Sequence, residues 1–169
     1  MQICEIKEMI QGPEFGLVGI PVGTADSDGA LLQPKNFGVL HAADHVHVNV
    51  YPFWGGVDIA GAREHMIYIL TQLRDILRRD SDGDRKVIAI GETGWPSVGT
   101  NGLAHGNVGN AERYWREVGC WLHVNGVPWV WFSGVDEPWK PDMGGVGGAE
   151  QNFGVMKVGS VDRKFEMKC

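Results

Sequence analysis

The chain has 169 residues, of which 43% are hydrophobic and 21% charged, and its formal net charge at pH 7 is −6. This length and composition predict one globular domain with its own core and exclude a disordered chain. The negative charge argues against nucleic acid as a partner, because phosphate binding favours a basic surface. No apolar run approaches the roughly 18 residues of a membrane span, and residues 1–8 mix charge with apolar groups, unlike a signal peptide.

The sequence contains three cysteines, which have no metal-like spacing and allow at most one disulfide and one free thiol. They are Cys4, Cys120 and Cys169, and any two of them could pair. There are also seven tryptophans and 25 glycines, and this many glycines implies many tight turns. Tryptophans in loops suit stacking on sugar rings, whereas the alternative for each is simple packing in the core.

Helices and strands alternate along the chain. Residues 3–10 are expected to form a helix, because isoleucines recur on one side of that segment. The apolar run 17–24 predicts the first strand, which leads to Asp26. A weaker helical pattern follows between residues 34 and 43.

The second predicted strand, residues 45–51, has the alternation of a strand with two different faces. Its valines suit a layer that faces helices, and its polar side chains suit the interior of a barrel. The polar set is His45, His47, Asn49 and Tyr51. Phe53 and Trp54 follow just beyond the end of this strand.

The clearest helix is predicted over residues 62–79, where apolar side chains recur at helical spacing. The next run, 87–97, begins as a buried strand, reaches Glu92 and breaks into a turn that carries Trp95. A strand that delivers an acid into a loop beside an aromatic ring is typical of sugar-cleaving sites on α/β barrels.

A last helix and a fourth strand complete the pattern. The helix is expected over residues 111–124, with Asn110 as its N-cap and Asn125-Gly126 as its C-terminal stop. The strand begins at Val127 and leads into a second loop of acidic and aromatic residues. That loop contains Asp136, Glu137, Trp139 and Lys140.

Alternating strands and helices predict an α/β fold with a parallel sheet and right-handed crossovers. Four strands are half of a (β/α)8 TIM barrel, which typically takes about 250 residues. An open flavodoxin-like sheet is the alternative, although the sequence contains no loop suited to a nucleotide phosphate.

Five segments in collinear order resemble glycoside hydrolase family 17, the β-1,3-glucanases. The run 90–97 resembles the family signature, and the run 131–140 resembles the last-strand motif of its fungal-type members. The remaining matches are the fifth-strand motif at 21–26, the sixth-strand motif at 48–53 and the closing segment at 150–155. The similarity covers nearly the whole chain from about Leu17 onward.

The resemblance implies that residues 1–169 form a single partial catalytic domain with strands five to eight of the barrel. The family's acid/base Glu belongs to a Gly-Asn-Glu motif at the end of strand four, and this motif does not occur here. The expected partners are therefore β-glucan and either a missing N-terminal half-barrel or a second copy of the chain. A half-barrel with open edges and an open sheet face is expected to self-associate.

The resemblance also implies the chemistry. Glu92 matches the nucleophile of a retaining hydrolase, which forms a covalent glycosyl intermediate. Glu137 and Lys140 match a polar network around it, and Glu137 is also considered as a replacement for the missing acid. The expected substrate-binding residues are Tyr51, Phe53, Trp95, Trp139, Asn49 and Asp26. No cofactor or metal is expected, and the family suggests an extracellular or cell-wall location.

Three alternatives stay open at this point. The chain could be a non-catalytic glucan-binding remnant, since the acid/base residue is missing. It could transfer the glycosyl group to a sugar hydroxyl instead of to water. Finally, His45 and His47 could bind a metal in a metal-dependent hydrolase, although no other predicted strand end offers a histidine.

Overall fold

A parallel sheet of four strands, in the order β1-β2-β3-β6, forms the centre of the structure. The structure is a computed structural model that describes residues 2–79, 83–142 and 145–169. The strands are β1 (Thr24–Ser27), β2 (His45–Asn49), β3 (Val87–Thr93) and β6 (Trp129–Trp131). The predicted α/β class and the parallel sheet are confirmed.

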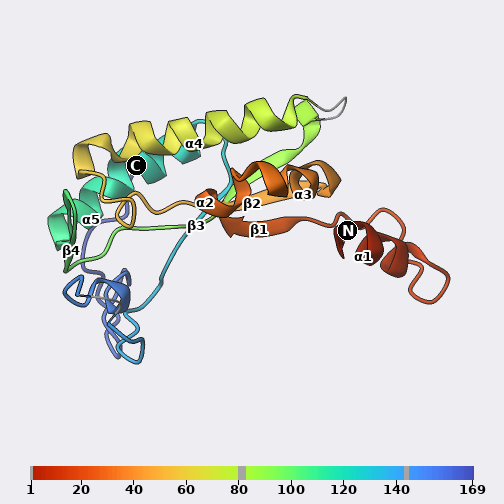
Figure 1. Ribbon diagram of the computed structural model, residues 1–169. Coiled ribbons are helices and arrows are strands. Elements are labelled where there is room, and N and C mark those ends of the chain that lie inside the picture. The colour runs from red at the N-terminus through yellow and green to blue at the C-terminus, as the bar shows by residue number, and fades with distance from the viewer. Residues whose placement is uncertain (1, 80–82, 143–144) are drawn as a thin grey trace.

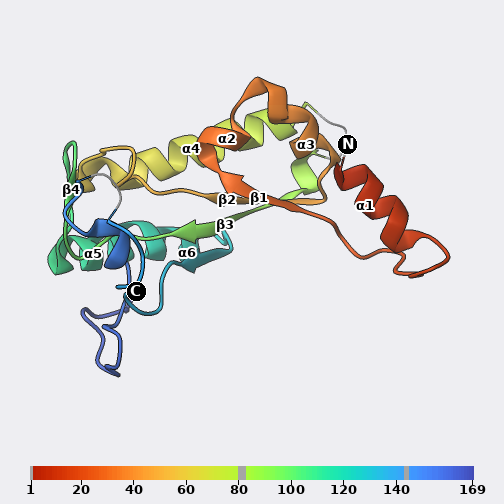
Figure 2. The ribbon, with the colours of Figure 1, turned by 60° about the horizontal axis from the view of Figure 1, so that its bottom comes forward.

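The helices that connect the strands lie on one side of the sheet in Figure 1, and α1 extends from the end at which the strands begin. Figure 2 shows α4 running alongside the strands. The α-helices are α1 (Gln2–Gln11), α2 (Asp28–Leu31), α3 (Phe37–Ala42), α4 (Ala62–Leu77), α5 (Val108–Tyr114) and α6 (Cys120–Val124). A small hairpin, not predicted from the sequence, consists of β4 (Thr100–Asn101) and β5 (Ala104–His105).

The core lies between the sheet and these helices, as the two sequence periodicities predict. In β2 and just beyond it the three valines are fully buried, while the polar residues between them are half-buried. Helix α4 presents one apolar stripe to the valines. The buried members of that stripe are Met66, Ile69, Leu73, Ile76 and Leu77. The predicted helix over 62–79 is therefore confirmed.

The helix predicted over 111–124 begins three residues earlier and contains a π-helical segment, Trp115–Gly119, between α5 and α6. Its N-cap is Asn107, whose side chain accepts a hydrogen bond from the backbone N–H of Asn110 at 2.8 Å. Asn110 as the N-cap was therefore wrong, and the expected stop at Asn125 is confirmed. Gly119 is required where it stands, because a Cβ there would lie 2.6 Å from the ring of Trp129.

The first predicted strand was wrong in position, since β1 begins only at Thr24. Gly16 and Gly19 have φ values of 62° and 85°, which are left-handed turn conformations rather than extended strand. The side chain of Asp44 accepts the backbone N–H of Val22 at 2.7 Å, and this bond leads the chain into the sheet. The helices expected near residues 3–10 and 34–43 are present as α1 and α3.

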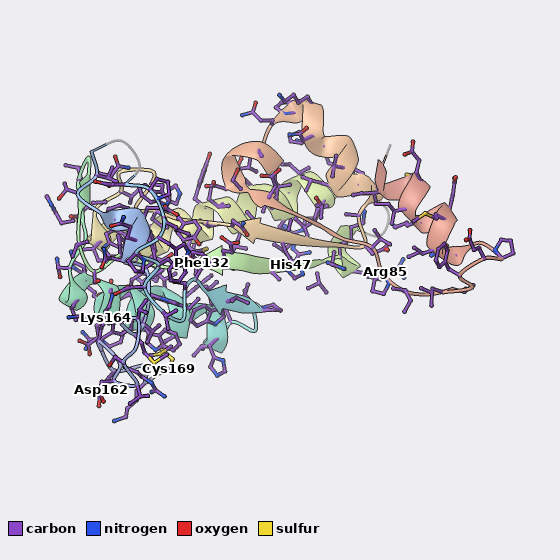
Figure 3. The ribbon with its side chains drawn as sticks, turned by 90° about the horizontal axis from the view of Figure 1, so that it is seen from below. His47, Arg85, Phe132, Asp162, Lys164 and Cys169 are labelled. Carbon is purple, nitrogen blue, oxygen red and sulfur yellow. A yellow bond between two sulfur atoms is a disulfide. The ribbon has the colours of Figure 1, made fainter. Side chains whose placement is uncertain are left out.

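The sheet face opposite the helices is largely open. Val87 and Val130 are 51% and 58% exposed, although both stand on strands. Figure 3 looks onto this side of the molecule, with His47 labelled on the sheet. No helix in the described ranges has the length and apolar content that a bilayer crossing requires.

The C-terminal segment is fastened to the rest of the fold at several points. A disulfide joins Cys120 on α6 to Cys169, and Cys4 is free and exposed. Phe165 is buried with its ring 5.6 Å from that of Trp131. The one disulfide and one free thiol allowed by the sequence are therefore both observed.

We expect the double change Cys120→Ser and Cys169→Ser to lower the free energy of unfolding by about 2–4 kcal/mol, because the open chain gains conformational entropy when unfolded. Urea denaturation under non-reducing conditions measures this loss. Cys4→Ser is the matched control and should leave the midpoint unchanged. Equal midpoints for all three proteins would contradict the expectation.

We also expect the chain to self-associate, because the open sheet face exposes apolar side chains and β1 has an unpaired edge. Static light scattering over a concentration series measures the molar mass. A chain that stays monomeric at high concentration would count against this prediction.

Candidate active site

A pocket of about 290 Å³ lies at the carboxyl ends of β2, β3 and β6, where the loops that follow these strands meet. It combines two carboxyl groups, one ammonium group and several aromatic rings. The lining residues are Tyr51, Trp54, Glu92, Phe132, Lys140, Glu150 and Phe153. In Figure 3, Phe132 lies between the sheet and the C-terminal segment that carries Lys164.

Glu92 reaches this pocket because β3 contains one extra residue. Val48 pairs with Ile90, but the next residue of β2, Asn49, pairs with Glu92, so Gly91 is left over as a bulge. Without the bulge, Glu92 would share the buried, helix-facing side of Ile90, since side chains alternate along a strand. With the bulge, the carboxylate instead shares the face of Asn49 at the rim of the sheet.

The two residues that flank the carboxylate support the bulge. Gly91 has no room for a side chain, because a Cβ there would lie 2.7 Å from Oδ1 of Asn49. Thr93 is fully buried, and its hydroxyl lies 2.6 Å from both the carbonyl oxygen of Val50 and the hydroxyl of Tyr114. Thr93 thus fixes the end of β3 against the helix layer while Glu92 faces the opposite side.

Tyr51 is the direct partner of Glu92. Its hydroxyl donates a hydrogen bond to Oε2 of the carboxylate at 3.0 Å. Burial, and then the charge and hydrogen bond of Glu92, raise the pKa of the Tyr51 phenol far above its ordinary value. The phenol therefore remains a hydrogen-bond donor to the carboxylate.

Lys140 connects two further acids on the other side of the pocket. Its ammonium lies 2.9 Å from Oε2 of Glu137 and 3.1 Å from Oε1 of Glu150, and 4.5 Å from the centre of the Phe132 ring. Partial burial acts to lower the pKa of Lys140, but the hydrogen bonds and charges of the two glutamates outweigh it and raise the pKa. Lys140 is thus a charged group shared by two carboxylates.

A second hollow lies beside this pocket on the β1 side of the sheet. Trp54 lines both, and its ring forms a wall between them. Its ring packs 5.2 Å from Phe53 and 5.7 Å from Phe153. The side chain of Asn101 in the β4–β5 hairpin donates to the carbonyl oxygens of Phe53 and Trp54, at 3.1 and 2.8 Å. The loop after β3 therefore holds the loop after β2 in place.

Several residues expected to bind substrate do not line this pocket. Phe53 and Trp95 are buried in the core, with their ring centres 5.5 Å apart. Because both rings are covered by other side chains, neither offers a face to a ligand. Asp26 is exposed and its side chain bonds to the adjacent Ser27. Trp139 is 68% exposed and does not line the pocket.

Other expected residues do come together. Glu92, Tyr51 and Lys140 line the pocket, Glu137 contacts Lys140, and Asn49 lines the second hollow. The sequence analysis missed Glu150, Phe132 and Phe153 as pocket residues. Their positions in the sequence were the available signal. Phe132 directly follows β6, and Glu150 and Phe153 lie in the closing segment 150–155. Loops at the carboxyl ends of barrel strands carry the active sites of such folds.

His45 and His47 lie on β2 with their rings 5.1 Å apart. Within the parts of the chain that the structure describes, no group of three or more His, Cys, Asp or Glu side chains could hold a metal ion. The metal alternative therefore lacks a ligand set among these residues.

The chain is similar to known glycoside hydrolases. Residues 2–154 match the BtgE/BtgC glycoside hydrolase domain. The glucan 1,3-beta-glucosidase of Saccharomyces cerevisiae is 31% identical over 152 residues, which are 89% of this chain and 48% of that protein. The glucan 1,3-beta-glucosidase of Arthroderma benhamiae is 32% identical over 160 residues, 89% of this chain and 51% of that protein. The chain thus spans about half the length of the curated relatives it matches.

Solved structures of glycoside hydrolase family 17 are also similar to this chain. The crystal structure of a glycoside hydrolase family 17 beta-1,3-glucanosyltransferase from Rhizomucor miehei has a TM-score of 0.76 and 28% identity, and covers 99% of this chain and 56% of that one. An active-site mutant of the Rhizomucor miehei protein, in complex with laminaritriose, has a TM-score of 0.76 and 27% identity, with the same coverage.

We expect Lys140→Met to lower the free energy of unfolding at pH 7 by about 1–3 kcal/mol, because it leaves two partly buried carboxylates without their cation. Because the folded-state pKa of Lys140 is raised, its contribution is complete below about pH 10.4 and disappears as the pH rises through the folded value.

Denaturation at a series of pH values tests this profile. Lys168→Met is the control, since Lys168 forms an ion pair with Glu166 at 3.0 Å on the exposed surface, where such pairs add little. A loss for Lys140→Met that does not vary with pH would contradict the expected charge interaction.

Proposed function

Because this chain belongs to glycoside hydrolase family 17, we propose that it acts on β-1,3-glucan by a retaining mechanism with Glu92 as the nucleophile. One observation carries the proposal: Glu92 faces a pocket that has aromatic walls and is lined by a shared Lys140–Glu150 ion pair. Relatives named as glucan 1,3-beta-glucosidases support the substrate class.

We further propose that residues 1–169 form the C-terminal half of the catalytic domain, with β1, β2, β3 and β6 as strands five to eight of a (β/α)8 barrel. The support is the relation in length, since matched relatives are about twice as long. An extracellular or cell-wall location is part of this proposal, and a disulfide between Cys120 and Cys169 suits an oxidising compartment.

In the first step, an oxygen of the Glu92 carboxylate attacks the anomeric carbon of a glucosyl unit. The bond between that carbon and the leaving oxygen breaks, the leaving oxygen takes the electron pair and a proton, and a glycosyl ester forms. Tyr51 orients the carboxylate for attack through its 3.0 Å hydrogen bond. In the second step, water adds to the anomeric carbon and gives a proton to the group that protonated the leaving oxygen, while the ester bond breaks and its electron pair returns to the Glu92 carboxylate.

The proton for the leaving oxygen needs a separate acid. Glu137 and Glu150 both contact the Lys140 ammonium, at 2.9 and 3.1 Å, so both carboxyl groups are engaged in ion pairs. We therefore assign them to the polar network rather than to the acid role. The resemblance to the family places the acid in a Gly-Asn-Glu motif, which this sequence does not contain.

Transfer of the glycosyl group to a sugar hydroxyl is the second candidate function. A specific observation favours it, because the structural relative from Rhizomucor miehei is named as a beta-1,3-glucanosyltransferase. The glycosyl ester on Glu92 is common to both reactions, and only the acceptor in the second step differs.

An activated substrate tests the nucleophile without the separate acid. We expect a laminaribioside with a dinitrophenolate leaving group and fluorine at C2 to label the chain, because dinitrophenolate leaves without a proton. Intact-protein and peptide mass spectrometry should find one glycosyl ester on Glu92. Glu92→Gln should reduce the labelling rate by roughly a thousandfold or more, and Glu64→Gln on the exposed face of α4 is the matched control.

The other readings give different outcomes. Binding of laminari-oligosaccharides without any label would favour the non-catalytic glucan-binding remnant. Loss of turnover with a chelator would favour a metal-dependent hydrolase that uses His45 and His47. A label on Glu137 or Glu150 in place of Glu92 would overturn the assignment of the nucleophile.

A further inference from the structure

A second hollow adjoins the pocket on the β1 side of the sheet and has a volume of about 450 Å³. Tyr51 and Trp54 line both hollows, so the two are neighbours across one aromatic wall. The remaining lining comes from the end of β1, the first residue of α2, the end of β2, the loop after β2 and the first turn of α4. The side chains that can form hydrogen bonds there are Ser27, Asp28, Asn49 and His65.

Asp28 and His65 face each other across a gap. Nε2 of His65 lies 3.8 Å from Oδ2 of Asp28, which is longer than a hydrogen bond, and both side chains are 28% exposed. The other carboxylate oxygen, Oδ1, accepts the backbone N–H of Gly29 at 2.8 Å. One oxygen of Asp28 is thus bonded to the backbone, and the other lies near the imidazole without a direct hydrogen bond to it.

The position of Asp28 is fixed by the local backbone. The hydroxyl of Ser27 accepts the backbone N–H of Ala30 at 3.3 Å and caps α2. His65 stands in the first turn of α4, a helix whose opposite side is buried in the core. Both groups therefore come from ordered elements, which is what recognition of a ligand requires.

Asn49 adds a third polar group on the floor of the same hollow. Its Oδ1 lies over Gly91, next to the bulge that directs Glu92. Since Asn49 and Glu92 are paired residues on neighbouring strands, the hollow begins directly beside the reacting carboxylate. A sugar chain with one unit at Glu92 would place a neighbouring unit here.

We propose that Asp28 and His65 bind a second, neutral glucosyl unit of the substrate, adjacent to the unit that reacts with Glu92. The inference rests on the proposed glucan-directed function and adds the residues that set its preference for chain length. Trp54 offers an apolar surface for the ring, and Asp28 and His65 offer partners for its hydroxyl groups. The Asp28 carboxylate disfavours sugars that carry acidic groups.

Binding of a single sugar unit and of an oligosaccharide tests the subsite. Isothermal titration of the unmodified chain with methyl β-glucoside and with laminaripentaose gives the reference affinities. We expect Asp28→Ala and His65→Ala each to weaken laminaripentaose binding by about tenfold, because a hydrogen bond to a charged or polar group is lost. Methyl β-glucoside has a single sugar unit and cannot span the pocket at Glu92 and the second hollow, so its affinity should change by less than about twofold.

Three further variants make the result specific. Asp75→Ala removes an acid from the exposed side of α4 and should not alter either affinity. Asp28→Asn keeps an acceptor oxygen and should recover part of the lost affinity. Gly91→Ala, which forces Oδ1 of Asn49 to move, should also weaken laminaripentaose. Thermal midpoints for all variants show that each protein is folded.

The outcomes separate this inference from the proposed function. Equal laminaripentaose affinity for the unmodified chain, Asp28→Ala and His65→Ala would overturn the subsite and leave the assignment of Glu92 intact. Equal losses for methyl β-glucoside and laminaripentaose would also overturn it, because the two residues would then affect the binding of the unit at Glu92 as well. No binding of laminaripentaose by the unmodified chain would overturn the proposed function together with the subsite.

Discussion

The one-residue bulge at Gly91 is the constraint on which the candidate site depends. A regular strand would direct Glu92 into the helix-facing layer, where an unpaired carboxylate is costly. The bulge changes the alternation by one residue, so Glu92 reaches the rim and Thr93 takes the buried place, where its hydroxyl has two partners. The same backbone shift brings Asn49 beside Glu92, so one irregularity shapes both hollows.

Loops provide the rest of the site, and they are held mainly by bonds to one another. Asn101 fixes the carbonyl groups beside Trp54. Lys164, with a side chain only 6% exposed, bonds to Asp136 at 2.6 Å and to Ser97 at 2.8 Å, and so joins the loops after β3 and β6 to the C-terminal segment. A buried ion pair of this kind restrains geometry more reliably than it adds stability. The loops that form the walls of the pocket are therefore linked to one another.

The sequence predicts the sheet, the long helix and the acid at the end of β3, because hydrophobic periodicity reports burial directly. It does not predict which of two adjacent aromatic residues faces the pocket. Phe53 and Trp54 stand in one turn, and only the tertiary contacts decide that Phe53 packs inside while Trp54 lines the cleft. For the same reason Asp26 was expected in the cleft, whereas Asp28 lies there. Glu150 was missed because its partner Lys140 is ten residues away in the sequence, outside any periodic pattern.

The disulfide between Cys120 and Cys169 has a mechanical consequence. It closes a covalent ring over residues 120–169, which includes β6, the loop with Glu137 and Lys140, and the segment with Glu150. A tension applied at Cys169 passes through the sulfur atoms into α6 and does not pull on the backbone between them. A tether at Cys169, for instance to an insoluble polymer, would therefore exert no force on the backbone that carries Lys140 and its two glutamates.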